Sequence, residues 1–376
     1  MALRWAFPDP AEVEARSAIE QRIDAWWSSV RAGRSRGAPP DADALAAIAP
    51  GLQVEVRRKS LIISPDGERR LLPLARRVIA RAPADLELQV LEARPPELVD
   101  EAIARARQKT GLDPSAWTVQ VEPQEHGLLA LRWRAPRVPD GAAEAAIVSS
   151  LALLGEPTLP DWVSSVTVEP RPSMVSRLLG AGGGALAELP RQLARAQAEW
   201  LARQADQPLL VSSRAGRDAN WKVVTLSPPA DSDGAGQRDL ERARTANVDL
   251  FKAARSGVPF ASARFSRFGE TFLYVKTDGF GDDGFSNTLA LEEALDRALS
   301  PDQLGRAIGA GTGTRYSYVD LVVKDVPRAL ERMLPVLRAG RLPTRAWVLF
   351  FDDTYADEWV GVWPRTEPPP SFRASK

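Results

Sequence analysis

Apolar residues in the first 170 positions follow helical and strand periods in turn. An apolar stripe that includes Ile23, Trp26, Trp27 and Val30 predicts a helix over 11–32. Further hydrophobic runs predict hairpins at 52–63 and 117–133. They also predict helices at 71–81, 97–108 and 142–154, and a closing strand at 162–168. We therefore assign residues 1–170 to one N-terminal α+β domain.

Residues 171–217 have a different pattern and predict a connecting region. The run Gly180-Ala-Gly-Gly-Gly184 predicts a flexible joint, because glycine is the residue least suited to a helix or strand interior. After it, apolar residues recur at three- and four-residue spacing from Leu186 to Trp200, which predicts an amphipathic helix. We expect this helix to dock on one of the domains.

Residues 218–366 predict a second α+β domain. The pattern first indicates a strand at 221–226, a helix over 238–255 and a strand at 260–265. It then predicts six elements in the order β-α-β-β-α-β, namely 271–276, 289–299, 306–308, 316–323, 326–337 and 345–351. This order is typical of a ferredoxin-like split βαβ sandwich, and 358–363 adds an edge strand. Residues 367–376, which open on a proline run, are expected to form a disordered tail.

Aromatic side chains gather on the predicted strands of the second domain. Tyr316, Tyr318 and Asp320 share one face of their strand, while Val319 and Leu321 share the face expected to lie on the helices. The first face is therefore predicted to be open, with Trp359 and Trp363 close to it. Open aromatic sheet faces also bind RNA, but the sequence signature of such RNA binders is missing from this chain. The negative charge of Asp320 also disfavours binding of a polyanion. We therefore predict that this face binds a protein partner.

Two other segments form an alternative ligand site. The glycine-rich run Gly309-Ala-Gly311-Thr-Gly313 resembles a phosphate-binding loop. Such a loop needs a helix after it, but here a strand follows. We therefore favour a turn between two strands. Asp352 and Asp353 follow a predicted strand, where paired carboxylates can bind a metal or divide acid and base roles. They are also ordinary turn residues.

Composition narrows the chemistry further. The 376 residues contain no cysteine and a single histidine, His126, which excludes thiolate metal clusters, disulfides, and any site that needs two imidazoles. His126 lies beside a predicted turn and is expected to be a solvated surface residue. Acidic and basic residues balance at 49 each, so no net charge recruits nucleic acid or an anionic membrane. No secretory signal or membrane span is evident, and we expect a cytoplasmic protein without metal or cofactor.

Short motifs in both halves resemble uncharacterised bacterial cytosolic α+β families of unknown function. In the first half these are Ala25-Trp-Trp27, Leu61-Ile-Ile-Ser-Pro-Asp-Gly67 and Arg81-Ala-Pro83. In the second half they are the run 309–321 and Leu349-Phe-Phe-Asp-Asp353. The resemblance covers part of each half and implies no activity.

Together these observations predict a non-catalytic protein that binds a macromolecular partner, as an adaptor, a regulator or an immunity-type protein. The predicted binding residues are Tyr316, Tyr318, Asp320, Trp359 and Trp363. The alternative is a small-ligand-binding protein, or a hydrolase or transferase, that uses Gly309, Gly311, Gly313, Asp352 and Asp353. Nucleic-acid binding is the least favoured interpretation.

Overall fold

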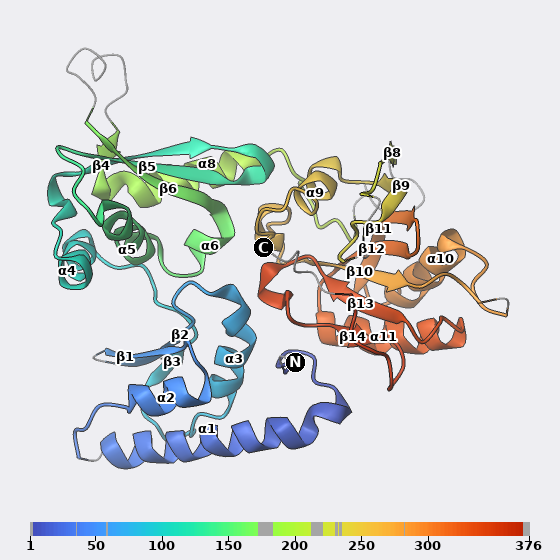
Figure 1. Ribbon diagram of the computed structural model, residues 1–376, viewed down its shortest axis with the longest axis horizontal. Coiled ribbons are helices and arrows are strands. Elements are labelled where there is room, and N and C mark those ends of the chain that lie inside the picture. The colour runs from blue at the N-terminus through green and yellow to red at the C-terminus, as the bar shows by residue number, and fades with distance from the viewer. Residues whose placement is uncertain are drawn as a thin grey trace. The chain divides into compact units, whose positions relative to one another are not determined.

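The computed structural model is a mixed α/β chain with several sheets. It describes residues 3–34, 36–57, 59–171, 183–211, 221–229, 232, 235–281 and 283–370. Its internal contacts divide it into two compact units (Figure 1), which we call the N-terminal unit, Glu14–Trp200, and the C-terminal unit, Met1–Val13 with Leu201–Lys376. Residues 180–182 of the predicted joint and 371–376 of the predicted tail lie outside the described residues.

The N-terminal unit begins with three helices around a small sheet. The helices are α1 (Val13–Arg34), α2 (Ala42–Ile48) and α3 (Leu72–Ala80), and the strands are β1 (Gln53–Arg57), β2 (Ser60–Ser64) and β3 (Gln89–Leu91). The predicted hairpin is confirmed as the antiparallel pair β1–β2, and β3 adds parallel to β2. The predicted stripe of α1 lies in the core, where the indole of Trp27 donates to the carbonyl of Val78 at 2.8 Å.

A second sheet completes the N-terminal unit. Its strands are β4 (Thr118–Pro123), β5 (Leu129–Ala135), β6 (Val163–Pro170) and β7 (Gly184–Ala185), in the order β6-β5-β4-β7. Its helices are α4 (Val99–Thr110), α5 (Ala142–Leu154), α6 (Thr158–Trp162) and α8 (Leu189–Leu201). Gly111 ends α4 at a φ of 72°, a left-handed conformation that glycine adopts without strain. The hairpin predicted at 117–133 is confirmed, and so are the helices predicted at 97–108, at 142–154 and from Leu186 to Trp200.

A buried carboxylate joins the two sheets of the N-terminal unit. Glu156 accepts hydrogen bonds from the Ser64 hydroxyl and from the backbone N–H groups of Gly67 and Arg94, at 2.7–3.0 Å. Ser64 is the last residue of β2 and Gly67 lies in the turn after it, whereas Glu156 follows α5. Because a buried carboxylate needs such partners, this residue holds the turn after β2 in place.

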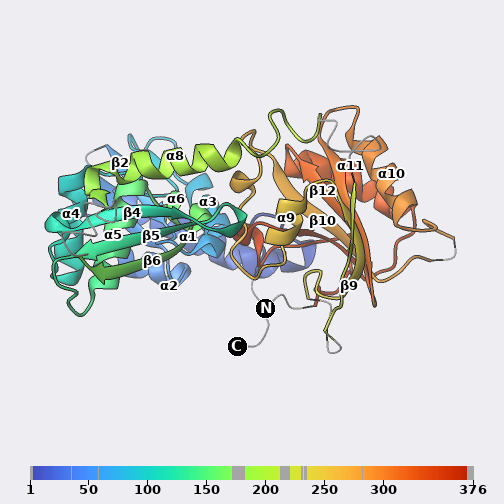
Figure 2. The same cartoon turned by 90° about the horizontal axis from the view of Figure 1, so that it is seen from above.

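The C-terminal unit is built on a seven-stranded antiparallel sheet of order β14-β13-β10-β12-β11-β9-β8. The strands are β8 (Lys222–Thr225), β9 (Leu240–Thr245), β10 (Thr271–Thr277), β11 (Gly305–Gly313), β12 (Ser317–Val323), β13 (Ala346–Phe350) and β14 (Val360–Gly361). Helices α10 (Thr288–Leu299) and α11 (Val326–Ala339) lie on one side of it, and α9 (Val248–Ala253) lies on the other (Figure 2). The six elements predicted over 271–351 are all present in the predicted order.

The two faces of this sheet differ in composition. The helix face, under α10 and α11, is apolar and carries Val319 and Leu321 against Leu295 and Met333. The opposite face, which we call the aromatic face, carries five large residues and their neighbours: Tyr274, Tyr316, Tyr318, Trp347 and Leu349. Strand alternation thus sorts the residues of β12 between the two faces as the sequence predicts.

Two predictions for 238–265 are wrong. Residues 240–245 are the strand β9, paired with both β8 and β11, and only 248–253 are helical. Asn247 begins that short helix by accepting the N–H of Leu250 at 3.0 Å, which explains why the helix does not start earlier. The predicted strand at 260–265 is a single 3₁₀ turn over Ser262–Arg264. Pairing between distant strands decides both segments, and local propensity cannot show such pairing.

The first residues of the chain belong to the C-terminal unit through an acidic anchor. The carboxylate of Glu358 accepts the backbone N–H groups of Trp5, Ala6 and Phe7 at 2.7–3.0 Å. The guanidinium of Arg4 lies 3.7 Å from the ring centroid of Trp359 and donates to its carbonyl. The N-terminal segment therefore covers the residues around Glu358. These contacts join residues that are more than 350 positions apart in the chain.

Candidate ligand pocket

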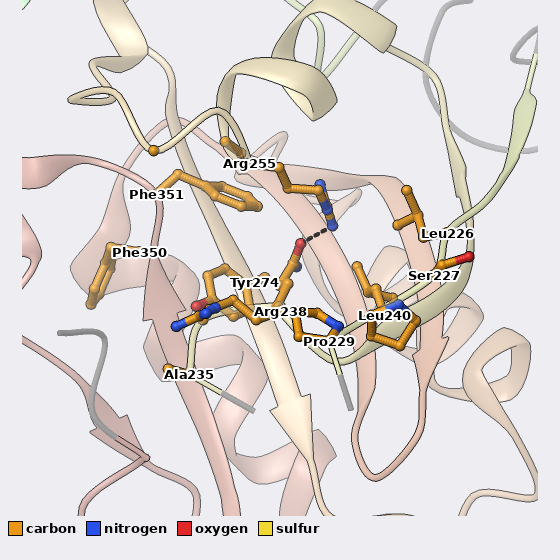
Figure 3. A pocket seen from close by; sticks show the side chains of 15 residues that line it. Leu226, Ser227, Pro229, Ala235, Arg238, Leu240, Arg255, Tyr274, Phe350 and Phe351 are labelled. Atoms are coloured by element: carbon orange, nitrogen blue, oxygen red, sulfur yellow. Dashed lines mark hydrogen bonds between the residues drawn. The ribbon is translucent and has the colours of Figure 1, made fainter. Parts of the chain in front are cut away.

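A pocket of about 650 Å³ opens over the aromatic face of the C-terminal unit. Tyr274 of the central strand β10, Leu240 of β9 and Phe351 beyond β13 contribute apolar surface to it, together with Leu226, Pro228 and Pro229 (Figure 3). Its polar side chains are Ser227, Gln237, Arg238 and Arg255. Few polar groups in a mostly apolar hollow of this size are typical of small-molecule sites.

Arg255 enters the pocket between Phe351 and Leu226 in the view of Figure 3. It follows α9 and donates from Nη1 to the carbonyl of Phe251 at 3.0 Å, with its guanidinium carbon 3.6 Å from the centroid of that ring. Its Nη2 donates to Oε1 of Gln237, the dashed contact in the figure. Both acceptors are neutral, and Nε is enclosed without a hydrogen-bond partner among the described residues.

Gln237 connects this arginine to a buried acid below the pocket. Its Nε2 donates to Oδ1 of Asp320 at 2.6 Å. Burial raises the pKa of Asp320 above its ordinary value, although the charge of Arg255 and the Gln237 hydrogen bond oppose that rise. Burial likewise lowers the pKa of Arg255, against the charge of Asp320. Opposite charges thus face each other across one amide, each of them poorly solvated.

A second acid, Asp239, fixes the turn that leads into β9. Its carboxylate accepts the hydroxyl of Tyr318 and the backbone N–H groups of Arg315 and Tyr316, the last two at 3.1 and 2.9 Å. Burial first, and then the hydrogen bond to Asp239, raise the pKa of Tyr318 far above its ordinary value. The tyrosine therefore stays protonated and acts as a donor that positions the segment lining the pocket.

Lys276 is fully buried beneath the same segment. Its Nζ donates to the carbonyl of Gly236 at 3.2 Å and lies 4.1 Å from the ring centroid of Tyr316. The hydroxyl of Tyr316 in turn accepts from Arg345, which also contacts Asp278 at 3.0 Å. These cations are engaged with aromatic rings and backbone, so they support the aromatic face and do not line the pocket.

The predicted open face is wrong. Tyr316 and Tyr318 are each 1% exposed, and Asp320 and Trp359 are also buried. Residues 235–240 and α9 cover the two tyrosines and Asp320, because strand pairing brings β9 beside β11 and lays the preceding turn over the face, whereas Arg4 lies over Trp359. The structure brings Tyr316, Tyr318 and Asp320 together as predicted, but Trp363 packs with the core of the helix face, where its indole donates to the carbonyl of Leu342.

The glycines of the alternative site lie inside a strand, so the favoured interpretation as a turn is also wrong. Gly309, Gly311 and Gly313 belong to β11 and alternate with Ala310 and Thr312. A Cβ atom on Gly311 would lie 2.5 Å from Leu240, and one on Gly313 would lie 2.4 Å from the Asp239 carboxylate. Glycine is needed here because β9 and its turn pack directly on this strip of the aromatic face.

The two aspartates of the alternative site lie elsewhere. Asp352 is buried and accepts the backbone N–H of Ser262 at 2.8 Å as well as the Ser262 hydroxyl, which makes it an anchor for the turn at 262–264. Asp353 begins a 3₁₀ turn and donates its N–H to the carbonyl of Phe260. Two strands, β10 and β12, separate β13 from β11, so these aspartates and the glycines do not form one site.

His126 differs from the expected surface residue. It adopts a left-handed backbone conformation, with a φ of 58°, in the turn between β4 and β5. Its side chain is only 16% exposed, and Nε2 lies 3.9 Å from Glu125. A Cβ atom on the neighbouring Gly127 would lie 2.4 Å from Trp200, so α8 packs closely on this turn. No reacting group accompanies the imidazole in these contacts.

The remaining features of the described residues give no second site of comparable quality. A hollow of about 340 Å³ in the N-terminal unit is lined by Val30, Leu61 and Leu88, with Arg34 and Arg57 as its charged residues. Arg57 is already paired with Glu55 and Glu97. Across the described ranges no three acidic or histidine side chains are grouped as a metal site would require, and none of the helices there combines the length and apolarity of a membrane span.

Comparison with known proteins adds no further constraint. No family model matches the chain, and neither a curated protein nor a solved structure is similar to it. The functional argument therefore depends on the pocket and on the residues around it. Sequence reasoning missed Arg255, Gln237 and Asp239, and the only signal it offered was the polar, proline-containing stretch that precedes β9.

Proposed function

We propose that this chain is a non-catalytic small-molecule-binding protein whose ligand occupies the pocket over the aromatic face. One observation carries the proposal: a pocket of about 650 Å³ lies on a sheet face whose aromatic side chains are held by hydrogen bonds or ring contacts. Ligand sites in proteins are commonly preformed hollows of roughly 300–1,000 Å³. A rigid floor lowers the entropic cost of ordering a ligand.

The lining favours binding over catalysis. Among its described residues there is no carboxylate, imidazole or amine that could act as a general base. Burial and the nearby charge of Asp320 raise the pKa of Tyr274 far above neutrality, so its phenol is a weak acid in this site. The hydroxyl of Ser227 therefore has no group beside it in the lining that could activate it.

We also propose that β10, α10, β11, β12, α11 and β13 form a ferredoxin-like module within a two-domain protein. The support is the strand order β13-β10-β12-β11, which places the fourth strand beside the first and the third between the first and the second. Both connecting helices lie on one face, as in a split βαβ unit. Strands β14, β9 and β8 extend this module on both edges.

Binding of a protein partner stays a prediction, but the residues chosen for it are covered. Tyr316, Tyr318 and Asp320 contact this chain's own segment 235–240, so a partner could reach them only if that segment moved away. The pocket is present without any such movement. Small-molecule binding is therefore the function that the geometry supports best.

The test uses N-phenyl-1-naphthylamine, an uncharged aromatic probe whose fluorescence rises in an apolar site. We expect saturable binding with a stoichiometry of one to the full chain. Ala254→Trp should abolish it, because Ala254 lines the pocket and an indole there would fill the hollow. Ala339→Trp, at an exposed position near the end of α11, is the matched control and should bind as the wild type does.

Two results would refute the proposal. One is the absence of saturable binding both for this probe and for its sulfonated analogue, 8-anilinonaphthalene-1-sulfonate. The other is binding that Ala254→Trp and Ala339→Trp leave equally unchanged while both variants unfold as the wild type does, since the probe would then occupy some other surface.

A further inference from the structure

We propose that the ligand of this pocket is an organic acid with an apolar, aromatic-sized body, and that Arg255 and Arg238 bind its anionic group. This inference rests on the proposed function and extends it to a class of ligand. The starting observation is the charge of the lining, which has two arginines and no acidic residue among its described members. The described lining therefore carries a net positive charge, although the whole chain has equal numbers of acidic and basic residues.

The hydrogen bonds of Arg255 leave it able to bind an anion. A guanidinium has five N–H donors, and the contacts of Arg255 with Phe251 and Gln237 use one each from Nη1 and Nη2. Within the part of the chain that the structure describes, no carboxylate forms an ion pair with this residue. The carboxylate whose charge acts on it is Asp320, which is hydrogen-bonded to the amide of Gln237.

Arg238 provides the second cation from the other segment that lines the pocket. It is exposed and, among the described residues, has neither an ion pair nor a hydrogen bond through its side chain. Arg238 is the sequence neighbour of Gln237, and Arg255 is hydrogen-bonded to Gln237. Gln237 is itself hydrogen-bonded to Asp320. A carboxylate or sulfonate in the pocket would gain charge-assisted hydrogen bonds from these guanidinium groups that a neutral group could not form.

The rest of the lining suits the body of such an acid. Tyr274 and Phe351 lie with ring centroids 4.9 Å apart and tilted by 38°, and they form an aromatic wall. Leu240 and Pro229 are also lining residues (Figure 3). Aromatic rings bury a large apolar area and stack best on other rings, so a planar apolar body is the favoured complement.

The experiment compares matched neutral and anionic probes on the full chain. N-phenyl-1-naphthylamine and 8-anilinonaphthalene-1-sulfonate differ by one sulfonate, and 1-naphthamide and 1-naphthoate form a second pair with a carboxylate. Competition fluorescence or calorimetry at low salt should show the anion of each pair binding about tenfold tighter or more, as expected for hydrogen bonds to a charged group. The preference should shrink as salt is raised.

Variants locate the anion. Arg255→Gln should remove most of the preference and leave the affinity for the neutral probes nearly unchanged. Arg238→Gln, at an exposed position, should reduce the preference severalfold without destabilising the fold, so it tests the inference even if Arg255→Gln does not fold. Arg332→Gln, an exposed arginine of α11 on the helix face, is the control and should have no effect.

The outcomes separate this inference from the function on which it rests. If the neutral and anionic members bind equally to a pocket that Ala254→Trp blocks, the ligand class is wrong and small-molecule binding stands. An anion preference that persists unchanged in both pocket variants would likewise overturn the assignment of Arg255 and Arg238. If neither member of either pair binds, both proposals fail.

Discussion

On one face of the seven-stranded sheet, α10 and α11 cover Val319, Leu321 and their neighbours with a closely packed apolar layer. On the other face, irregular segments cover Tyr318, Asp320 and Lys276 through hydrogen bonds with Asp239, Gln237 and Gly236, respectively. Both faces belong to the same strands. Regular helices fill their face completely, whereas polar turns fixed at a few points leave a hollow, and that hollow is where a ligand can bind.

The largest expected effect tests how completely each face is packed. Leu321→Ala on the helix face and Leu240→Ala beside the pocket both remove three carbons from buried leucines. Such substitutions cost about 2–5 kcal/mol, more where a new cavity opens in a well-packed layer. We expect Leu321→Ala near the upper end and Leu240→Ala near the lower end of this range in urea unfolding. Equal losses would contradict the difference in packing.

The next effect tests the hydrogen bonds that hold the aromatic face. Tyr318→Phe removes one of the three described donors to the Asp239 carboxylate, which should lower the free energy of unfolding by about 1.5–3 kcal/mol. Tyr274→Phe is the matched control, because its hydroxyl has no hydrogen-bond partner among the described residues, and we expect a change of at most about 0.5 kcal/mol. Similar changes in both variants would show that the hydrogen bond from Tyr318 to Asp239 does not stabilise the fold.

A smaller effect tests the close approach of β9 to β11. In Gly311→Ala the new methyl group meets Leu240 and the carbonyl of Arg242, and this overpacking should cost about 1–2 kcal/mol. Thr312→Ala changes an exposed neighbour in the same strand and should stay within about 0.5 kcal/mol of the wild type in the same unfolding measurement. If Gly311→Ala were neutral, the glycines would not be required for the packing of this face.

The smallest effect concerns pH and distinguishes two carboxylates of the C-terminal unit, Asp278 and Asp320. Burial tends to raise the pKa of Asp278, but the hydrogen bonds and charges of Arg315 and Arg345 outweigh it and hold this pKa below 3.8. Asp278 therefore stabilises the fold above about pH 4, and this contribution is lost as the pH falls. Asp320, whose pKa is raised by burial, contributes stability at low pH that is lost as the pH rises through its folded pKa.

Urea unfolding from pH 3 to 7 measures both contributions. Relative to the wild type, Asp278→Asn should lose stability as the pH rises from 3, whereas Asp320→Asn should gain stability over the same range. Curves that run parallel to the wild type for both variants would show that neither pKa shift contributes to folding.

Much of the fold could be predicted from local pattern. Alternation along β12 placed Val319 and Leu321 on one face and Tyr316, Tyr318 and Asp320 on the other, and helical stripes located α1, α10 and α11. These predictions succeed because a strand or helix that buries one side must repeat its own period. The prediction for 238–255 failed, since β9 is defined by its partners β8 and β11 and not by its own sequence.

The candidate site was beyond the reach of the same reasoning. Its polar residues Gln237, Arg238 and Arg255 lie on irregular segments with no period, and their positions depend on contacts with Asp320 and Phe251. The glycines of β11 signalled a close approach of backbone, but the approaching segment comes from β9 and its turn instead of a phosphate.

The sequence by itself determined which elements form and which side chains share a face, because both follow from spacing along one strand or helix. Only the tertiary structure decided whether each face is covered, and by what. The cover of Tyr318 by Asp239 and the anchoring of Trp5 by Glu358 join residues far apart in the chain. Such contacts depend on the free energy of packing the whole unit. The residue pattern of a single segment contains no information about that free energy.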